Sequence, residues 1–105
     1  MDVVKERLEF RIKGTLILRR RGRFYKVITT RSAGGNWWTF ECKDVESKQN
    51  RVFKYEMLGM LETLDSAAKV MKDPKDILLI DLDNQGKWKI MTEEEIDKAM
   101  KEPSQ

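Results

Sequence analysis

The sequence predicts a small α+β domain, in which a curled antiparallel β-sheet of four to five strands is followed by a helix, a β-hairpin and a C-terminal helix. Alternation of apolar and polar residues over 7–19 is typical of a half-buried strand. From Met57 to Met71 the apolar spacing changes to three and four, as on one face of a helix. A capping box, with Thr92 as N-cap and Glu95 three residues later, marks the start of a last helix.

Length and charge indicate one domain with two unlike halves. The chain has 105 residues, of which 37% are charged, and this length is typical of a single domain. Residues 1–55 carry 14 Lys and Arg against 6 Asp and Glu, whereas residues 56–105 carry 7 against 12. We therefore expect one domain, 1–105, with a basic β-meander over 1–55 and an acidic α/β extension over 56–105.

The first hairpin follows from the alternation. Gly14 is expected to bend the first strand, whose core residues are Leu8, Phe10, Ile12, Leu16 and Leu18. Arg21 and Gly22 form the turn, and the returning strand covers 24–30. If this turn is a two-residue loop, the opposite pairs are Leu18 with Tyr25 on the inner face and Arg19 with Phe24 on the outer face, where Lys26 also lies.

Two more strands complete a four-stranded meander. A loop over 32–36 precedes the third strand, 37–43, and the fourth strand covers 51–55. On the third strand the core positions are Trp38, Phe40 and Cys42, and the opposite face carries Trp37, Thr39 and Glu41. In strand number and turn spacing this half of the chain resembles the small SH3-like barrels, the Tudor and related modules. The resemblance implies a closed barrel, and no diagnostic motif accompanies it.

The segment after the meander has two interpretations. Its spacing favours a helix over 57–71, although Gly59 weakens that assignment. The alternative is a fifth strand over 57–64, followed by a short helix that opens at Asp65 or Ser66.

The C-terminal part is predicted by local signals. Strands over 76–82 and 87–91, joined by a polar turn, form a second hairpin. The last helix covers 93–101, and Met91 and Ile96 occupy the two positions of a hydrophobic staple.

Composition excludes several kinds of chemistry. The chain has no histidine, which removes the commonest general base and every imidazole metal ligand. Cys42 is the single cysteine, so no internal disulfide can form and a reducing, cytoplasmic location is expected. No apolar run approaches the ~20 residues that span a bilayer. We expect a protein that is not an enzyme and has no cofactor, no metal site and no membrane association.

The segment Asp81–Gly86 resembles the first half of an EF-hand calcium loop. Carboxylates stand at positions one and three, and a glycine at position six. However, position twelve is Thr92, where a bidentate glutamate is required, and the residues before Asp81 form a strand pattern. We therefore interpret the segment as a hairpin turn rich in turn-favouring residues.

The densest cluster of basic residues lies on the first hairpin and predicts binding of DNA or RNA. Guanidinium groups pair with phosphate oxygens, and aromatic faces stack on unpaired bases. The expected phosphate contacts are Arg19, Arg20, Arg21, Arg23, Lys26 and Arg31. Phe24 and Trp37 are the expected stacking residues. The choice between DNA and RNA stays open.

The same residues also permit other interpretations. The basic and acidic halves could neutralise each other within the fold, and aromatic residues of a small β-domain often belong to its core. The alternative function is that of a protein–protein adaptor. Its partner would be a peptide in a barrel groove near Tyr25, Trp37 and Tyr55, or a larger assembly that contacts the acidic C-terminal helix.

Overall fold

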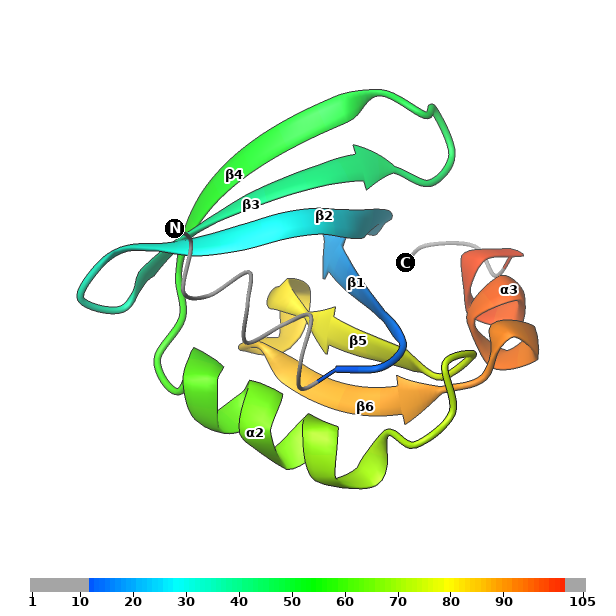
Figure 1. The fold of residues 1–105 in the computed structure, drawn as a ribbon. Helices are drawn as coiled ribbons and strands as arrows, with labels where there is room; N and C mark the ends of the chain where they lie inside the picture. Colours follow the sequence, from blue (N-terminus) through cyan, green and yellow to red (C-terminus); the bar gives the residue numbers. More distant parts are fainter. Residues whose placement is uncertain (1–11, 102–105) are drawn as a thin grey trace.

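The structure of the protein, a computed structural model, describes residues 12–101 and confirms the α+β class. The strands form a six-stranded sheet in the order β4-β3-β2-β1-β5-β6 (Figure 1). The elements are β1 (Thr15–Arg20), β2 (Arg23–Gly34), β3 (Trp37–Asp44), β4 (Asn50–Glu56), α2 (Met60–Val70), β5 (Ile77–Asp81), the 3-10 turn η1 (Leu82–Asn84), β6 (Lys87–Met91) and α3 (Glu93–Lys101). Residues 7–11 of the expected first strand lie outside the described residues.

The meander and the second hairpin are joined by a parallel pairing that the sequence did not predict. β1 pairs antiparallel with β2 and parallel with β5, so that Leu16 lies opposite Leu78 and Leu18 opposite Ile80. All four residues of the run 77–80 are buried, which is typical of a strand covered on both faces. The two halves of the chain therefore share one sheet.

This sheet is curled but open. β4 and β6 are the edge strands of the described sheet, so closure into an SH3-like barrel is not confirmed. The curl still brings β4 close to η1: the Tyr55 hydroxyl of β4 donates a hydrogen bond to the carbonyl oxygen of Leu82 at 3.2 Å. Figure 1 shows β2, β3 and β4 bending over β1, β5 and β6.

The two faces of the sheet have different coverings. The inner face, defined as the face that packs on α2, forms the main core with Met60, Leu64 and Ala67 of the helix. Among the described elements, α3 covers the opposite, outer face over β1, β5 and β6 and reaches Phe24 of β2. The buried residues of that second cluster are Ile17, Ile77, Leu79, Met91 and Ile96.

The first hairpin has the predicted register. Arg19 lies opposite Phe24 and Leu18 opposite Tyr25. Arg21 and Gly22 form the turn with φ angles of 52° and 74°, the pair of positive values that a two-residue hairpin turn requires. The returning strand is longer than predicted, because β2 continues to Gly34 and leaves only a tight turn where a loop over 32–36 was expected.

Gly14 lies at a bend, as predicted, and its lack of a side chain is needed for packing. A Cβ atom at this position would collide with the carbonyl oxygen of Asp76. The neighbouring amide of Thr15 donates a hydrogen bond to that same oxygen at 3.0 Å. The glycine thus allows the chain to enter β1 directly beside the segment that leads into β5.

The segment after the meander is helical, and the alternative strand over 57–64 is wrong. The helix begins later than the pattern suggested, because Gly59 takes the left-handed conformation as its N-cap residue. The C-terminal helix has the predicted bounds, and its capping box is formed: Glu95 N–H donates to Thr92 Oγ1 at 3.2 Å, and Thr92 N–H donates to Glu95 Oε1 at 3.1 Å. Within residues 12–101, neither helix has the length and apolar character that crossing a bilayer would require.

Candidate nucleic-acid interface

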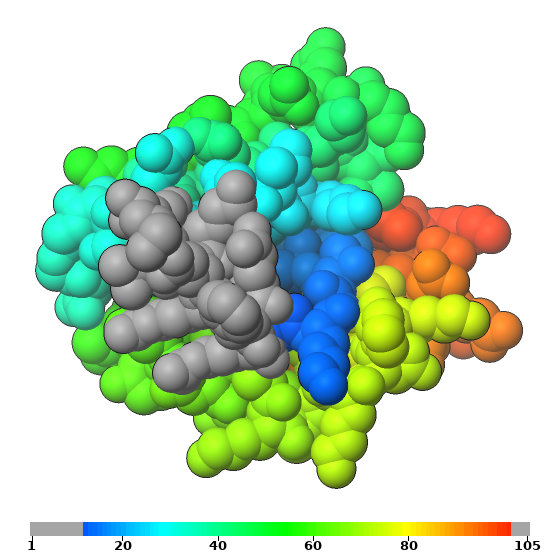
Figure 2. Space-filling view, viewed as in Figure 1, coloured from blue at the N-terminus to red at the C-terminus, as the bar shows by residue number. Residues whose placement is uncertain are grey.

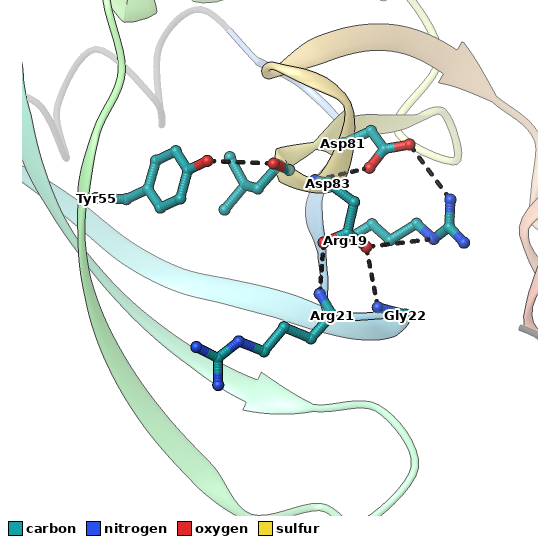
Figure 3. A network of polar contacts seen from close by, with 7 residues as sticks. Arg19, Arg21, Gly22, Tyr55, Asp81 and Asp83 are labelled. Carbon is teal, nitrogen blue, oxygen red and sulfur yellow. Dashed lines mark hydrogen bonds and ion pairs between the residues drawn. The ribbon is translucent and has the colours of Figure 1, made fainter. Parts of the chain in front are cut away.

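The turn between β1 and β2 is held by carboxylates of the second hairpin. Asp83 accepts hydrogen bonds from the backbone amides of Arg21 (2.6 Å) and Gly22 (2.9 Å), as Figure 3 shows. Burial alone would raise the pKa of Asp83, but the two amide donors and the nearby Arg19 lower it overall. Arg19 also contacts Asp81 at 3.4 Å. The predicted basic ribbon is therefore partly neutralised at this turn.

Other arginines of the predicted site have partners as well. Arg23 donates from Nε to Asp44 at 2.7 Å, and Arg31 pairs with Glu41. The guanidinium of Arg20 stacks on the ring of Phe53, 4.4 Å from its centroid. The pairing carboxylates belong to β3, the turn after β3, β5 and η1, and none of those described comes from the acidic start of α3.

The predicted residues do not form one surface. Residue alternation places Arg20 on the inner face, while Phe24, Lys26, Arg31 and Trp37 lie on the outer face. Arg19 also lies on the outer face, Arg21 is exposed at the turn, and Arg23 points towards Asp44.

The two predicted stacking residues differ in accessibility. Phe24 is half-buried against the second cluster under α3, so it is not a free platform. Trp37 is 42% exposed, and the Lys54 ammonium lies 5.5 Å from the centroid of its ring. Trp38, by contrast, is buried in the main core, as its opposite parity predicted.

The outer face of β2, β3 and β4 carries basic residues that the sequence analysis missed. Lys26 lies opposite Lys43, and Arg31 is linked through Thr39 to Lys54 across the three strands. Among residues 12–101, Lys26, Lys43 and Lys54 form no ion pair. We call this surface the open face, and it consists of Lys26, Ile28, Thr29, Arg31, Trp37, Thr39, Glu41, Lys43, Asn50, Val52, Lys54 and Glu56.

A signal for the missed lysines was present in the sequence. Lys43 has the same parity as Trp37, Thr39 and Glu41, which were predicted to face outward. Lys54 could be added only once the register between β3 and β4 was known, because that register places it opposite Thr39.

The open face also has apolar residues. Ile28 is 55% exposed and Val52 is 67% exposed. Ile28 is the extra residue of a β-bulge between Val27 and Thr29, and Val52 lies opposite Glu41 on the next strand. Alternation from the buried Val27 already directs Ile28 outward, and the bulge then keeps Thr29 on the outer face and turns Thr30 inward.

The groove expected for a peptide is not formed by its predicted residues. Tyr25 is buried and packs edge-on against Phe53, with ring centroids 4.8 Å apart. Tyr55 lies on the same inner face and bonds to Leu82, whereas Trp37 lies on the outer face. The three aromatic residues therefore do not line one groove, because Trp37 lies on the opposite side of the sheet from Tyr25 and Tyr55.

The calcium-like segment is a hairpin turn, as interpreted from its sequence. Asp81 accepts a hydrogen bond from the amide of Asp83 at 3.0 Å, and Asp83 in turn binds the arginine turn. No cluster of potential metal ligands is found within residues 12–101. Cys42 is buried, and burial raises the pKa of its thiol to about 11, so it is not poised for reaction.

Comparison of the chain with protein-family models, curated proteins and solved structures gave no significant match. A function is therefore inferred from the residues and geometry of this chain alone.

Proposed function

We propose that the protein binds single-stranded nucleic acid on its open face. The observation that carries this proposal is the combination of Lys26, Lys43 and Lys54, which have no ion-pair partner among residues 12–101, with the exposed indole of Trp37 on a sheet surface that neither α2 nor α3 covers. The lysines would contact phosphates, and Trp37 would stack on an unpaired base. Sheet surfaces that combine basic and aromatic side chains are a common way to bind single strands.

The charges of the open face support a polyanionic ligand. Of its two acidic residues, Glu41 is paired with Arg31, and Glu56 lies opposite Trp37 at the end of β4. The three lysines therefore still leave an excess of positive charge on the face. The exposed side chain of Arg21, at the nearby turn, would add to the field without being part of the face. The remaining arginines of the predicted ribbon act mainly within the fold.

The test is a titration of fluorescently labelled single-stranded DNA and RNA, followed by anisotropy at several salt concentrations. The double variant Lys26→Glu with Lys43→Glu should weaken binding at least about tenfold and reduce the slope of log K against log salt by roughly 1.4. Both residues are exposed strand positions, so the fold should be retained.

The matched control is Lys69→Glu with Lys72→Glu, which makes the same change in net charge beside α2, on the other side of the sheet. This control should retain most of the affinity. An equal loss in both double variants, or no saturable binding by the parent protein, would contradict the proposal.

A protein partner is the second candidate, because Ile28 and Val52 are exposed apolar residues on the same face. The double variant Ile28→Lys with Val52→Lys separates the two functions in the same titration. Added charge should strengthen nucleic-acid binding, whereas it should abolish the docking of an apolar protein surface. Weaker binding to oligonucleotides by this variant would favour the adaptor.

A further inference from the structure

A groove of about 730 Å³ lies at the border of the outer face, apart from the open face. Its walls come from the β1–β2 turn, the β5–β6 hairpin, the segment after β3 and the end of α3. Figures 1 and 2 show α3 beside the strands β1 and β5 at this side of the molecule. Its volume is in the range of pockets that hold one small organic molecule.

The groove has an apolar lining with one aromatic ring. Phe24 is half-buried, and Leu79, Met91 and Met100 complete the apolar part. The Trp88 residue borders the groove, but its alternation directs the side chain to the inner face, where it packs against the main core. Phe24 belongs to the cluster under α3, which fixes it as a wall of the groove. Flat apolar surfaces of this kind favour a planar ring system in the ligand.

The charged residues around the groove leave an excess of positive charge. Its acidic residues already have partners: Asp81 lies 3.4 Å from Arg19, and Glu46 lies 3.9 Å from Arg23. Lys87 and Lys89, two exposed residues on β6, form no ion pair within residues 12–101. Both lysines line the groove and have the parity of the outer face.

We propose that this groove binds a small aromatic anion, a planar ring system that carries a phosphate, sulfonate or carboxylate group. The rings lie against the edge of Phe24 and the apolar side chains of Leu79, Met91 and Met100, and the anionic group lies near Lys87 and Lys89. None of the lysines of the open face lines the groove, so this inference is independent of nucleic-acid binding.

The test compares two dyes that share their rings and differ in one charged group. 8-Anilinonaphthalene-1-sulfonate is the anionic probe, and N-phenyl-1-naphthylamine is its neutral counterpart. Both should bind the folded protein with saturation. The variant Lys87→Glu with Lys89→Glu should lower the affinity for the anionic dye about tenfold. Its affinity for the neutral dye should change less than about twofold.

Two further variants make the result specific. Lys87→Gln with Lys89→Gln should give an intermediate loss of affinity for the anionic dye. Because this variant adds no carboxylates, it also shows whether the Glu variant loses affinity only through an effect on folding. Lys43→Glu with Lys54→Glu makes the same charge change on the open face and should leave the affinity for both dyes unchanged. Amide NMR spectra should place the shifts of bound dye on the groove, at β6 and the end of α3.

Competition identifies the anionic group. Displacement of the anionic dye by a nucleoside 5′-monophosphate assigns a phosphate-bearing ligand, and displacement by 2-naphthoate alone assigns a carboxylate. The proposal is overturned if neither compound displaces the dye, if the dye does not saturate, or if the control double variant loses as much affinity as the groove variant. Shifts confined to other surfaces would overturn it too.

Discussion

Asp44 shows how a single buried carboxylate organises the basic end of the sheet. It is 2% exposed, accepts from Arg23 Nε at 2.7 Å, and accepts from the amides of Glu46 and Ser47 at 2.9 and 3.1 Å. The hydrogen bond from Arg23 is the main cause that lowers the pKa of Asp44 to about 2, against the opposing effect of burial. The carboxylate therefore fixes both Arg23 and the turn after β3.

This network predicts a defined dependence of stability on pH. The folded pKa of about 2 lies below the ordinary value of 3.8, so the contribution of Asp44 is complete above about pH 4 and is lost as the pH falls towards 2. Asp44→Asn should lower the free energy of unfolding by about 1–3 kcal/mol at pH 7, and it should flatten the pH dependence between 4 and 2. Urea unfolding at several pH values measures both effects.

Glu41→Gln is the matched control for Asp44, because its ion pair with Arg31 is exposed. It should change the free energy of unfolding by less than about 1 kcal/mol. If Asp44→Asn keeps the same stability and pH dependence as the parent, the proposed role of Asp44 is wrong.

At the scale of elements, the sequence predicts what local signals determine. Thr92 and Glu95 located the start of α3, and Arg21 with Gly22 located the first turn, because capping and turn formation involve neighbouring residues. The parallel pairing of β1 with β5 joins segments about sixty residues apart, and alternation alone carries no information about such a partner.

The same limit explains the candidate site. The parity of Lys26 and Trp37 was readable in the sequence, and both lie on the outer face as expected. The ion pairs of Arg19 were not predictable, because only the β1–β5 pairing brings Asp81 opposite it. The sequence therefore predicted an exposed basic surface on the first hairpin, although several of its arginines form ion pairs that stabilise the fold.

The N-cap of α3 gives a prediction for this element. Thr92→Ala removes the acceptor of the Glu95 amide and should lower the free energy of unfolding by about 1 kcal/mol. Thr92→Ser keeps the hydroxyl and should cost much less. Thermal and urea unfolding of the two variants check the difference, and equal stabilities would show that the capping box contributes nothing measurable.

At the scale of the whole molecule, the charge asymmetry is partly neutralised where the two halves meet. The parallel pairing sets Arg19 against Asp81, and η1 delivers Asp83 to the β1–β2 turn. The lysines on the far strands of the sheet are beyond the reach of these carboxylates. The uncompensated positive charge is thus displaced from the predicted hairpin to the open face.

The central claim, that nucleic acid binds this open face, is tested most directly by NMR titration of the isotope-labelled protein with single-stranded oligothymidylate at low salt. The account predicts shifts of the amides at Lys26, Lys43 and Lys54 and of the Trp37 indole, while α2 remains unchanged. Shifts confined to α2, or to the β1–β2 turn and α3, would contradict it, as would spectra that do not change.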